Sequence, residues 1–496
     1  MRIIRVSPTD SETVLPGSHM LHDRGSSNIT DRGRAKRACD ACKQRKVKCN
    51  GHATCQQCSH LTLRCTYTER SPRDKPRMRR GERIAMYRTA QATGLAPVAV
   101  PSSPSKSPSA NIHDSQYFRR LLQIYTSAIY SFIPIVSPEE CEQEIENMDK
   151  DPQSRSFLCA LAAVTLAQTG GVCEDDSEAY NEVDQLTREA LELRGVLWLR
   201  PTINIKTIMT AEFLHVCFAS MSRRDAAFFY LREAITLAQV SDYFSQYELE
   251  SCSDRTEVAR RQRLFWLLFI HERFFAIHYS LPANLKVDDM PTEFDEFLPP
   301  LLHEGFLQII NVFQLIDEPM LAAWVGRTED ISLEWIQEKN RDLKNVPDIS
   351  ALSEMQQVDI LITRNWLLTV LWKIAMTKYP LNDTSPKDFM SLLFPIDVFK
   401  RTLAIVSQAS VHSLAVNGAS ARQKLLDLLN TVADIITVVI IPSAQVATDE
   451  IANYLAMAKI ILSLPGVSIR SRETIQRKLA NIEATIAVSP RSSVPH

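Results

Sequence analysis

Cys39-Asp-Ala-Cys42-Lys-Gln-Arg-Lys-Val-Lys-Cys49 is followed, after a short loop, by Cys55-Gln-Gln-Cys58 and then by Cys65. The spacing is C-x2-C-x6-C-x5-C-x2-C-x6-C, which is two copies of C-x2-C-x6-C. A structural zinc ion takes four tetrahedral ligands, so one ion would leave two of the six thiolates over. Two ions need eight ligand positions, which six sulfurs supply only if two of them bridge. The spacing therefore predicts a closed cluster of two Zn²⁺ ions with no open position for hydrolysis. The predicted ligands are Cys39, Cys42, Cys49, Cys55, Cys58 and Cys65.

The charge of the chain is concentrated around this cysteine block. From Arg32 to Arg88 there are 17 lysines and arginines against four acidic residues, a net charge of +13, whereas the whole chain carries −2. A compact basic segment on an otherwise acidic protein indicates a local contact with a polyanion. The flanks at 32–37 and 70–83 predict phosphate contacts and nuclear import; the alternative is a solvated charge run.

Two other interpretations of the cysteine block have to be weighed. The first thirty residues are polar and contain no apolar run of the secretory type, so we expect an intracellular protein, in which clustered cysteines bind metal rather than pair as disulfides. A zinc knot used only for protein contacts is the other alternative. The remaining cysteines lack paired spacing and are predicted to be buried small apolar residues. They are Cys141, Cys159, Cys173, Cys217 and Cys252.

The rest of the chain predicts a mainly α fold. Residues 1–31 are polar and aperiodic and predict a disordered arm, residues 32–69 form the zinc cluster domain, and residues 70–113 hold a basic segment and a Pro/Ser-rich linker that is too polar to fold alone. Residues 114–496 are expected to form one large all-helical regulatory domain. Helices are expected near 117–128, 213–221, 228–240, 258–278, 305–326, 355–377, 396–412, 421–440, 445–463 and 472–486. The longest apolar runs are far shorter than the ~20 residues of a membrane-spanning helix, so no membrane is expected as a partner.

The stretch Ala38–Cys49 resembles the fungal binuclear zinc cluster transcription factors, and Cys55–Cys58 with Leu63–Tyr67 match the second half of their motif. The resemblance implies that Cys39 and Cys55 bridge the two metals and that a short helix after Cys39 docks in the major groove. It also implies that Lys46 reads a CGG triplet through guanine O6 and N7. Neighbouring basic residues would then hold phosphates or flank the bases; they are Lys43, Arg45 and Lys48.

The loop Asn50–Thr54 departs from that family. The family usually has a proline before the fourth cysteine, and this loop has none. Gly51 can supply the turn instead, because glycine adopts conformations closed to other residues.

Two helical segments, Arg224–Gln239 and Arg260–Phe274, resemble the fungal-specific regulatory (middle homology) domain of the same proteins. The second is similar to a subgroup that includes sugar-utilisation activators and regulators of secondary-metabolite gene clusters. The resemblance implies a nuclear, sequence-specific RNA polymerase II transcription factor, a pathway-specific activator in secondary metabolism or else in carbohydrate utilisation. Its implied partners are promoter DNA, the transcription machinery and, in a homodimer, a second copy; an inducer is not identified. The alternative is a zinc-stabilised interaction or co-regulator protein that does not read DNA.

The helical part carries no recognisable catalytic pattern. Neither phosphate-binding glycine motifs nor a G-x-S-x-G nucleophile motif appear, and His271-Glu272 lacks the second histidine of a zincin. We therefore expect that the protein is not an enzyme. His215, His271 and His278 are expected to be interior or boundary histidines rather than ligands. The acidic and aromatic segment 288–298 suits an activation segment or, equally, an interhelical loop.

Overall fold

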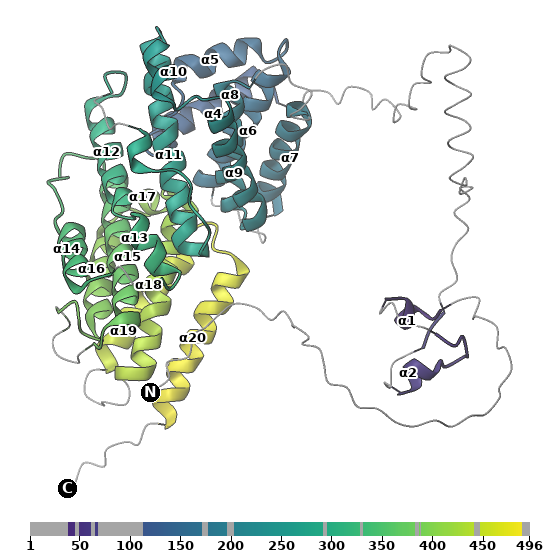
Figure 1. Cartoon of the computed structure of the whole chain (residues 1–496), viewed down its shortest axis with the longest axis vertical. Helices are drawn as coiled ribbons and strands as arrows, with labels where there is room; N and C mark the ends of the chain where they lie inside the picture. Colours follow the sequence, from purple (N-terminus) through teal and green to yellow (C-terminus); the bar gives the residue numbers. More distant parts are fainter. Residues whose placement is uncertain are drawn as a thin grey trace, which may run out of the picture. The chain divides into compact units, whose positions relative to one another are not determined.

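The computed structural model describes residues 38–44, 49–60, 65–67, 113–170, 177–195, 203–290, 295–327, 331–381, 386, 388–440 and 447–488. They belong to two compact units that divide between residues 107 and 108, and each unit is described by itself. Throughout these ranges the regular structure is helical and no strand occurs, which confirms the mainly α prediction (Figure 1). The predicted arm at 1–31 and nearly all of the predicted linker at 70–113 lie outside the described residues, and the domain boundaries stay predictions.

The small unit contains two short helices, α1 (Asp40–Gln44) and α2 (Gln56–His60). Each begins directly after the first cysteine of its half. The backbone N–H of Asp40 donates to the carbonyl of Thr66 at 2.9 Å, which ties the start of α1 to the end of the unit. Among its described residues the buried cluster consists of four cysteines: Cys39, Cys42, Cys55 and Cys58. So small an apolar core cannot stabilise a fold by burial, so a metal has to supply the folding energy.

The large unit begins with helices that pack around α6 and α8. α6 contacts α7 and α8, and α8 contacts α9. The helices of this part are α4 (Ser115–Ile124), which continues into the π-helical turn η1 (Tyr125–Ile129), α5 (Pro138–Asn147), α6 (Pro152–Thr169), α7 (Ser177–Arg194), α8 (Ile205–Ser220), α9 (Arg224–Val240) and α10 (Gln246–Ser251).

The long helix α11 (Arg255–Tyr279) connects these helices to the rest of the unit, because it contacts α8 and α9 as well as α12 and α13. In the second part α15 contacts α14, α16 and α18. The remaining elements are the 3-10 turn η3 (Val287–Asp289), α12 (Pro300–Gln314), α13 (Glu318–Trp324), α14 (Leu333–Lys344), α15 (Glu354–Lys378), α16 (Phe394–Gln408), α17 (Val411–Val416), α18 (Gly418–Ile435), the π-helical turn η4 (Ile436–Ile440), α19 (Ala447–Ser463) and α20 (Ile469–Val488).

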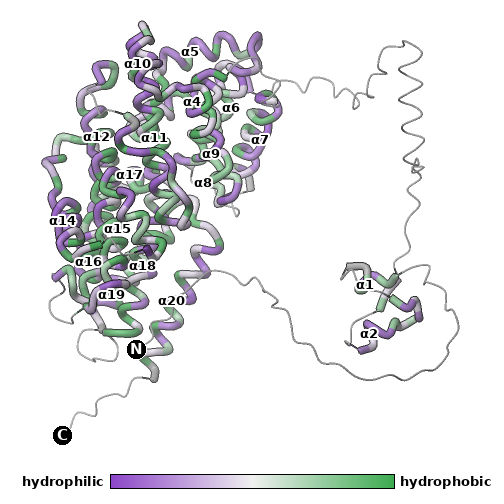
Figure 2. Tube along the Cα trace, viewed as in Figure 1, coloured by the Kyte–Doolittle hydropathy of each residue, from purple (hydrophilic) through white to green (hydrophobic). Residues whose placement is uncertain are grey.

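The inner helices are buried around most of their circumference. α8 and α15 expose few side chains, and their buried residues do not follow a single stripe. Figure 2 shows long hydrophobic stretches on α15, whereas α14 is coloured mainly as hydrophilic. A helix that is apolar all round belongs in the core of a large domain, so α8, α11 and α15 form the centre and α7 and α14 its cover.

Side-chain caps explain where many helices start and why two expected helices are divided. The expected helix at 305–326 is α12 and α13, because Asp317 caps a new helix with Pro319 in its first turn. The expected helix at 396–412 ends at Gln408, and Ser410 caps α17. Single helices over these two ranges were therefore wrong predictions.

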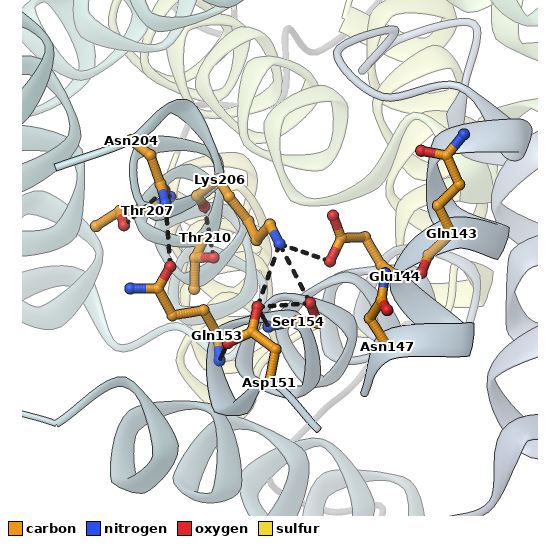
Figure 3. A network of polar contacts seen from close by, with 10 residues as sticks. All are labelled: Gln143, Glu144, Asn147, Asp151, Gln153, Ser154, Asn204, Lys206, Thr207 and Thr210. Atoms are coloured by element: carbon orange, nitrogen blue, oxygen red, sulfur yellow. Dashed lines mark hydrogen bonds and ion pairs between the residues drawn. The ribbon is translucent and has the colours of Figure 1, made fainter. Parts of the chain in front are cut away.

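A polar network joins α5, α6 and α8 (Figure 3). Lys206 of α8 donates to Glu144 of α5 at 2.7 Å and to Ser154 of α6 at 3.2 Å, and its ammonium lies 3.6 Å from Asp151. Asp151 and Asn204 are also the N-caps of α6 and α8. The same groups therefore start two helices and hold three together.

One of the cysteines predicted to be buried, Cys252, is not fully buried. Cys141, Cys159 and Cys217 are fully buried as expected, and Cys173 lies outside the described residues. Cys252 is only partly buried, because it lies in the connection between α10 and α11, where its thiol donates to the carbonyl of Asp254.

The acidic segment 288–298 contains a buried ion pair. Asp295 is buried, and its Oδ2 lies 3.3 Å from Nε of Arg263, which fits an interhelical loop.

As for membranes, the search of the described helices finds none with the length and apolar character needed to span a bilayer.

Candidate metal centre and nucleic-acid interface

The six cysteine sulfurs of the small unit form two sets of four. One set is Cys39, Cys42, Cys49 and Cys55, and the other is Cys39, Cys55, Cys58 and Cys65. Within each set all ligand atoms lie within 4.8 Å of one another. Cys39 and Cys55 belong to both sets. Six sulfurs therefore offer eight ligand positions, which is the number that two tetrahedral ions require.

The two halves of the unit repeat the same local contacts. In the first half the backbone N–H of Cys42 donates to Sγ of Cys39 at 3.4 Å. In the second half the backbone N–H of Cys58 donates to Sγ of Cys55, also at 3.4 Å. Likewise, the backbone N–H of Cys39 donates to Sγ of Cys49 at 3.5 Å, and the backbone N–H of Cys55 donates to Sγ of Cys65 at 3.3 Å. Backbone N–H groups stabilise negatively charged sulfur, so each half presents thiolates in the same way.

The sulfur spacing fits zinc. Cys39 Sγ lies 3.6 Å from the sulfurs of Cys55 and Cys58, and Cys42 Sγ lies 3.5 Å from that of Cys55. Sulfurs bound tetrahedrally to one zinc at the usual Zn–S distance are about 3.8 Å apart. Two zinc ions held by these sulfurs would supply the cross-links that hold the unit together, and the sulfur sets would leave no position for a water ligand.

In the absence of metal the crowded thiols cannot all be ionised together. Burial, with hydrogen bonds to the thiols of Cys39 and Cys55, raises the pKa of Cys42 to about 12. For Cys55 burial also raises the pKa, but the N–H of Cys58 and the surrounding thiols outweigh it and lower the pKa to about 6. Bound cations remove this conflict, because they let all the sulfurs be thiolates together.

The loop between the halves is built on Gly51 and Tyr67. Gly51 has φ 78°, in the left-handed region that glycine adopts without strain, so this loop changes direction at a glycine rather than at a proline. The phenol of Tyr67 donates to the carbonyl of His52 at 2.8 Å and lies 3.7 Å from Cys49 Sγ. Burial and the neighbouring Cys49 raise the pKa of Tyr67, so the phenol stays protonated. Sequence reasoning noted Tyr67 only as part of a motif; its position just after the sixth cysteine was the available signal.

We expect Tyr67→Phe to weaken zinc binding about tenfold, because groups that contact metal ligands from outside typically contribute that much. Competition of the full chain with a chelator at fixed pH measures the effect. Thr66→Ala is the matched control, since its side chain is exposed and its carbonyl still accepts from Asp40. Equal zinc affinity in Tyr67→Phe and the unaltered chain would contradict this role.

The structure describes little of the predicted DNA-contacting surface. Lys43 lies on α1, the helix expected after Cys39. Arg45, Lys46 and Lys48 lie outside the described residues, so their contacts stay predictions.

Comparison with known proteins agrees with the geometry. Residues 37–74 match the family model of the fungal Zn(2)-Cys(6) binuclear cluster domain. This segment is a Zn(2)-Cys(6) binuclear cluster domain. The resemblance to the fungal zinc cluster transcription factors and the prediction of two zinc ions are thereby confirmed. The assignment of single cysteines as ligands stays a prediction.

Similarity to fungal regulators extends far beyond the cluster. The probable sucrose utilization protein SUC1 of Candida albicans is 24% identical over 411 residues, which cover 80% of this chain and 78% of that protein. The maltose fermentation regulatory protein MAL13 of Saccharomyces cerevisiae is 24% identical over 422 residues, 82% of this chain and 85% of that protein. The transcription factor kojR of Aspergillus flavus is 20% identical over 311 residues, 52% and 55% of the two chains.

Proposed function

We propose that this protein is a sequence-specific DNA-binding transcription factor of RNA polymerase II, a pathway-specific activator that reads CGG-type triplets. The observation that carries the proposal is the pair of sulfur tetrads sharing Cys39 and Cys55, within a segment that matches the zinc cluster domain. In the proposed cluster these two cysteines bridge both zinc ions. Cys42 and Cys49 complete one tetrahedron, and Cys58 and Cys65 complete the other.

The zinc cluster acts in this proposal as a rigid base for a basic surface. Lys46 contacts the O6 and N7 acceptors of guanine in the major groove. Lys43, Arg45 and Lys48 contact phosphates or flank the bases, which orients the module without specifying sequence. The net charge of +13 over residues 32–88 supplies the attraction to the duplex.

Carbohydrate utilisation is the pathway class that the relatives favour. The sucrose and maltose proteins align with about four fifths of this chain, whereas the kojR protein aligns with about half of it. Control of a secondary-metabolite cluster is the second candidate, and the kojR alignment supports it. The proposal further includes nuclear localisation, a homodimer on paired half-sites, contact with the transcription machinery, and no enzymatic activity.

A steep loss of affinity with salt is the expected result for a DNA-binding function. Four phosphate or base contacts by cationic side chains predict a slope of log affinity against log salt of about −4 or steeper. Binding of the full chain to duplex DNA over a range of salt concentrations measures it. Replacing Lys43, Arg45 and Lys48 together by glutamine should reduce the slope by about 3.

The interaction-protein alternative predicts a different outcome of that titration. A zinc knot that serves only protein contacts would give weak binding to duplex DNA and no change of slope in the triple variant. That outcome would replace the present proposal.

A further inference from the structure

We propose a third divalent metal site, in the helical unit, where Glu212, His215 and His271 hold a Zn²⁺ ion. The three side chains each offer one ligand atom, and these atoms lie within 4.8 Å of one another. The site is separate from the cysteine cluster and uses nitrogen and oxygen ligands only. Two imidazoles and one carboxylate are a ligand set that zinc takes in three-ligand protein sites.

The helix geometry brings the three groups together. Glu212 and His215 are three residues apart on α8, so both lie on one face of that helix. His271 comes from α11, which packs against α8. Ligands of a tetrahedral zinc with nitrogen and oxygen donors are about 3.4 Å apart, so side-chain movements of about 1 Å close the set.

Glu212 has the strongest need for a cation. It is fully buried, and its Oε1 is hydrogen-bonded to Nδ1 of His271. Its other oxygen, Oε2, is buried and has no hydrogen-bond partner among the described residues. Burying a carboxylate oxygen without a hydrogen-bond partner is destabilising, because the oxygen loses its water and gains nothing in return. A metal ion offsets this cost and uses the lone pair that the protein leaves open.

His215 is already in the form that binds metal. Its Nδ1 lies 2.8 Å from the carbonyl oxygen of Ala227. Because a carbonyl can only accept, Nδ1 carries the hydrogen and Nε2 keeps its lone pair. A carbonyl on the second ring nitrogen is the usual outer contact of a metal-binding histidine.

Water can approach the proposed site from the side of His271. His271 is less buried than the other two side chains and lines a partly open cavity together with Gln168, Leu267 and Asn417. A water molecule in that cavity can complete the tetrahedron. The metal would join α8 to α11, and thereby the first helices of the unit to the later ones.

The metal content of the full chain tests the proposal. After loading with zinc and removal of the excess, elemental analysis should give three zinc ions per chain for the unaltered protein. Glu212→Gln, which keeps the size of the side chain, and His271→Ala should each give one zinc fewer. His278→Ala is the matched control, since His278 lies on the same helix but pairs with Asp427; it should keep all three ions.

The test compares each variant with the unaltered chain, so its outcome does not depend on how much zinc the cysteine cluster holds. Loss of the cysteine cluster changes the total in all four proteins, but it leaves the difference of one ion intact. Circular dichroism of each variant shows whether the helices are retained, and Glu212→Gln with native helicity and one ion fewer supports the site. The same zinc content in Glu212→Gln, His271→Ala and the unaltered chain would overturn it.

Discussion

Replacing Cys55 with alanine should unfold the zinc module and reduce DNA affinity to the non-specific level, a loss of at least about 10³-fold. Cys55 belongs to both sulfur sets, so its removal leaves neither metal with four ligands. Among the described residues of the module, the buried side chains are those of cysteines, so little apolar packing replaces the metal. Structural zinc contributes on the order of 10 kcal/mol to folding in small domains, which is more than such a module can lose.

Cys252→Ala is the control for this experiment. Cys252 is partly buried in the helical unit and lies outside the cysteine cluster, so its loss should leave DNA affinity unchanged. Binding to a CGG-containing duplex, with zinc content measured in parallel, gives the comparison. Full affinity in Cys55→Ala would mean that the cluster does not hold the DNA-binding surface.

Lys46→Ala should lower the preference for CGG-containing DNA by about 1–3 kcal/mol, or roughly 5- to 150-fold. The lysine is expected to reach two acceptors of one guanine, and alanine leaves both without a partner. Affinity for unrelated duplexes should fall much less, because one cation among many contributes little to phosphate contact. The ratio of dissociation constants for specific and scrambled duplexes measures the effect.

Lys75→Ala provides the contrasting variant. Lys75 belongs to the basic flank after the cluster, where a phosphate contact would weaken binding equally on all sequences. If Lys46→Ala behaved in the same way as Lys75→Ala, Lys46 would not be the residue that reads the triplet.

Most of the candidate zinc site could be predicted from the cysteine spacing. The count of ligands required two shared sulfurs, and the two tetrads in the structure share Cys39 and Cys55. Tyr67 could not be predicted in its role, because its contact with His52 depends on how the loop closes. The proposed site at Glu212 could not be predicted either, because its histidines come from two helices far apart in the sequence, and an isolated histidine in an apolar helix is normally part of the core.

Several long helices were predicted, including α11 and α15, which are buried over most of their surface. α9 and α11 lie close to their expected ranges, whereas residues 138–194 gave no helix in the sequence analysis and contain α5, α6 and α7. α6 is buried over most of its surface, so its apolar residues follow no stripe of helical period. Asp151 and Pro152 were its start signal, as N-cap and first helical residue.

Selection of bound duplexes from a random pool by the zinc-loaded full chain tests the central claim most directly. Enrichment of CGG-type triplets that disappears when the zinc is chelated is the result we predict. A pool that stays random with intact zinc and folded protein would contradict the claim that this cluster reads DNA sequence.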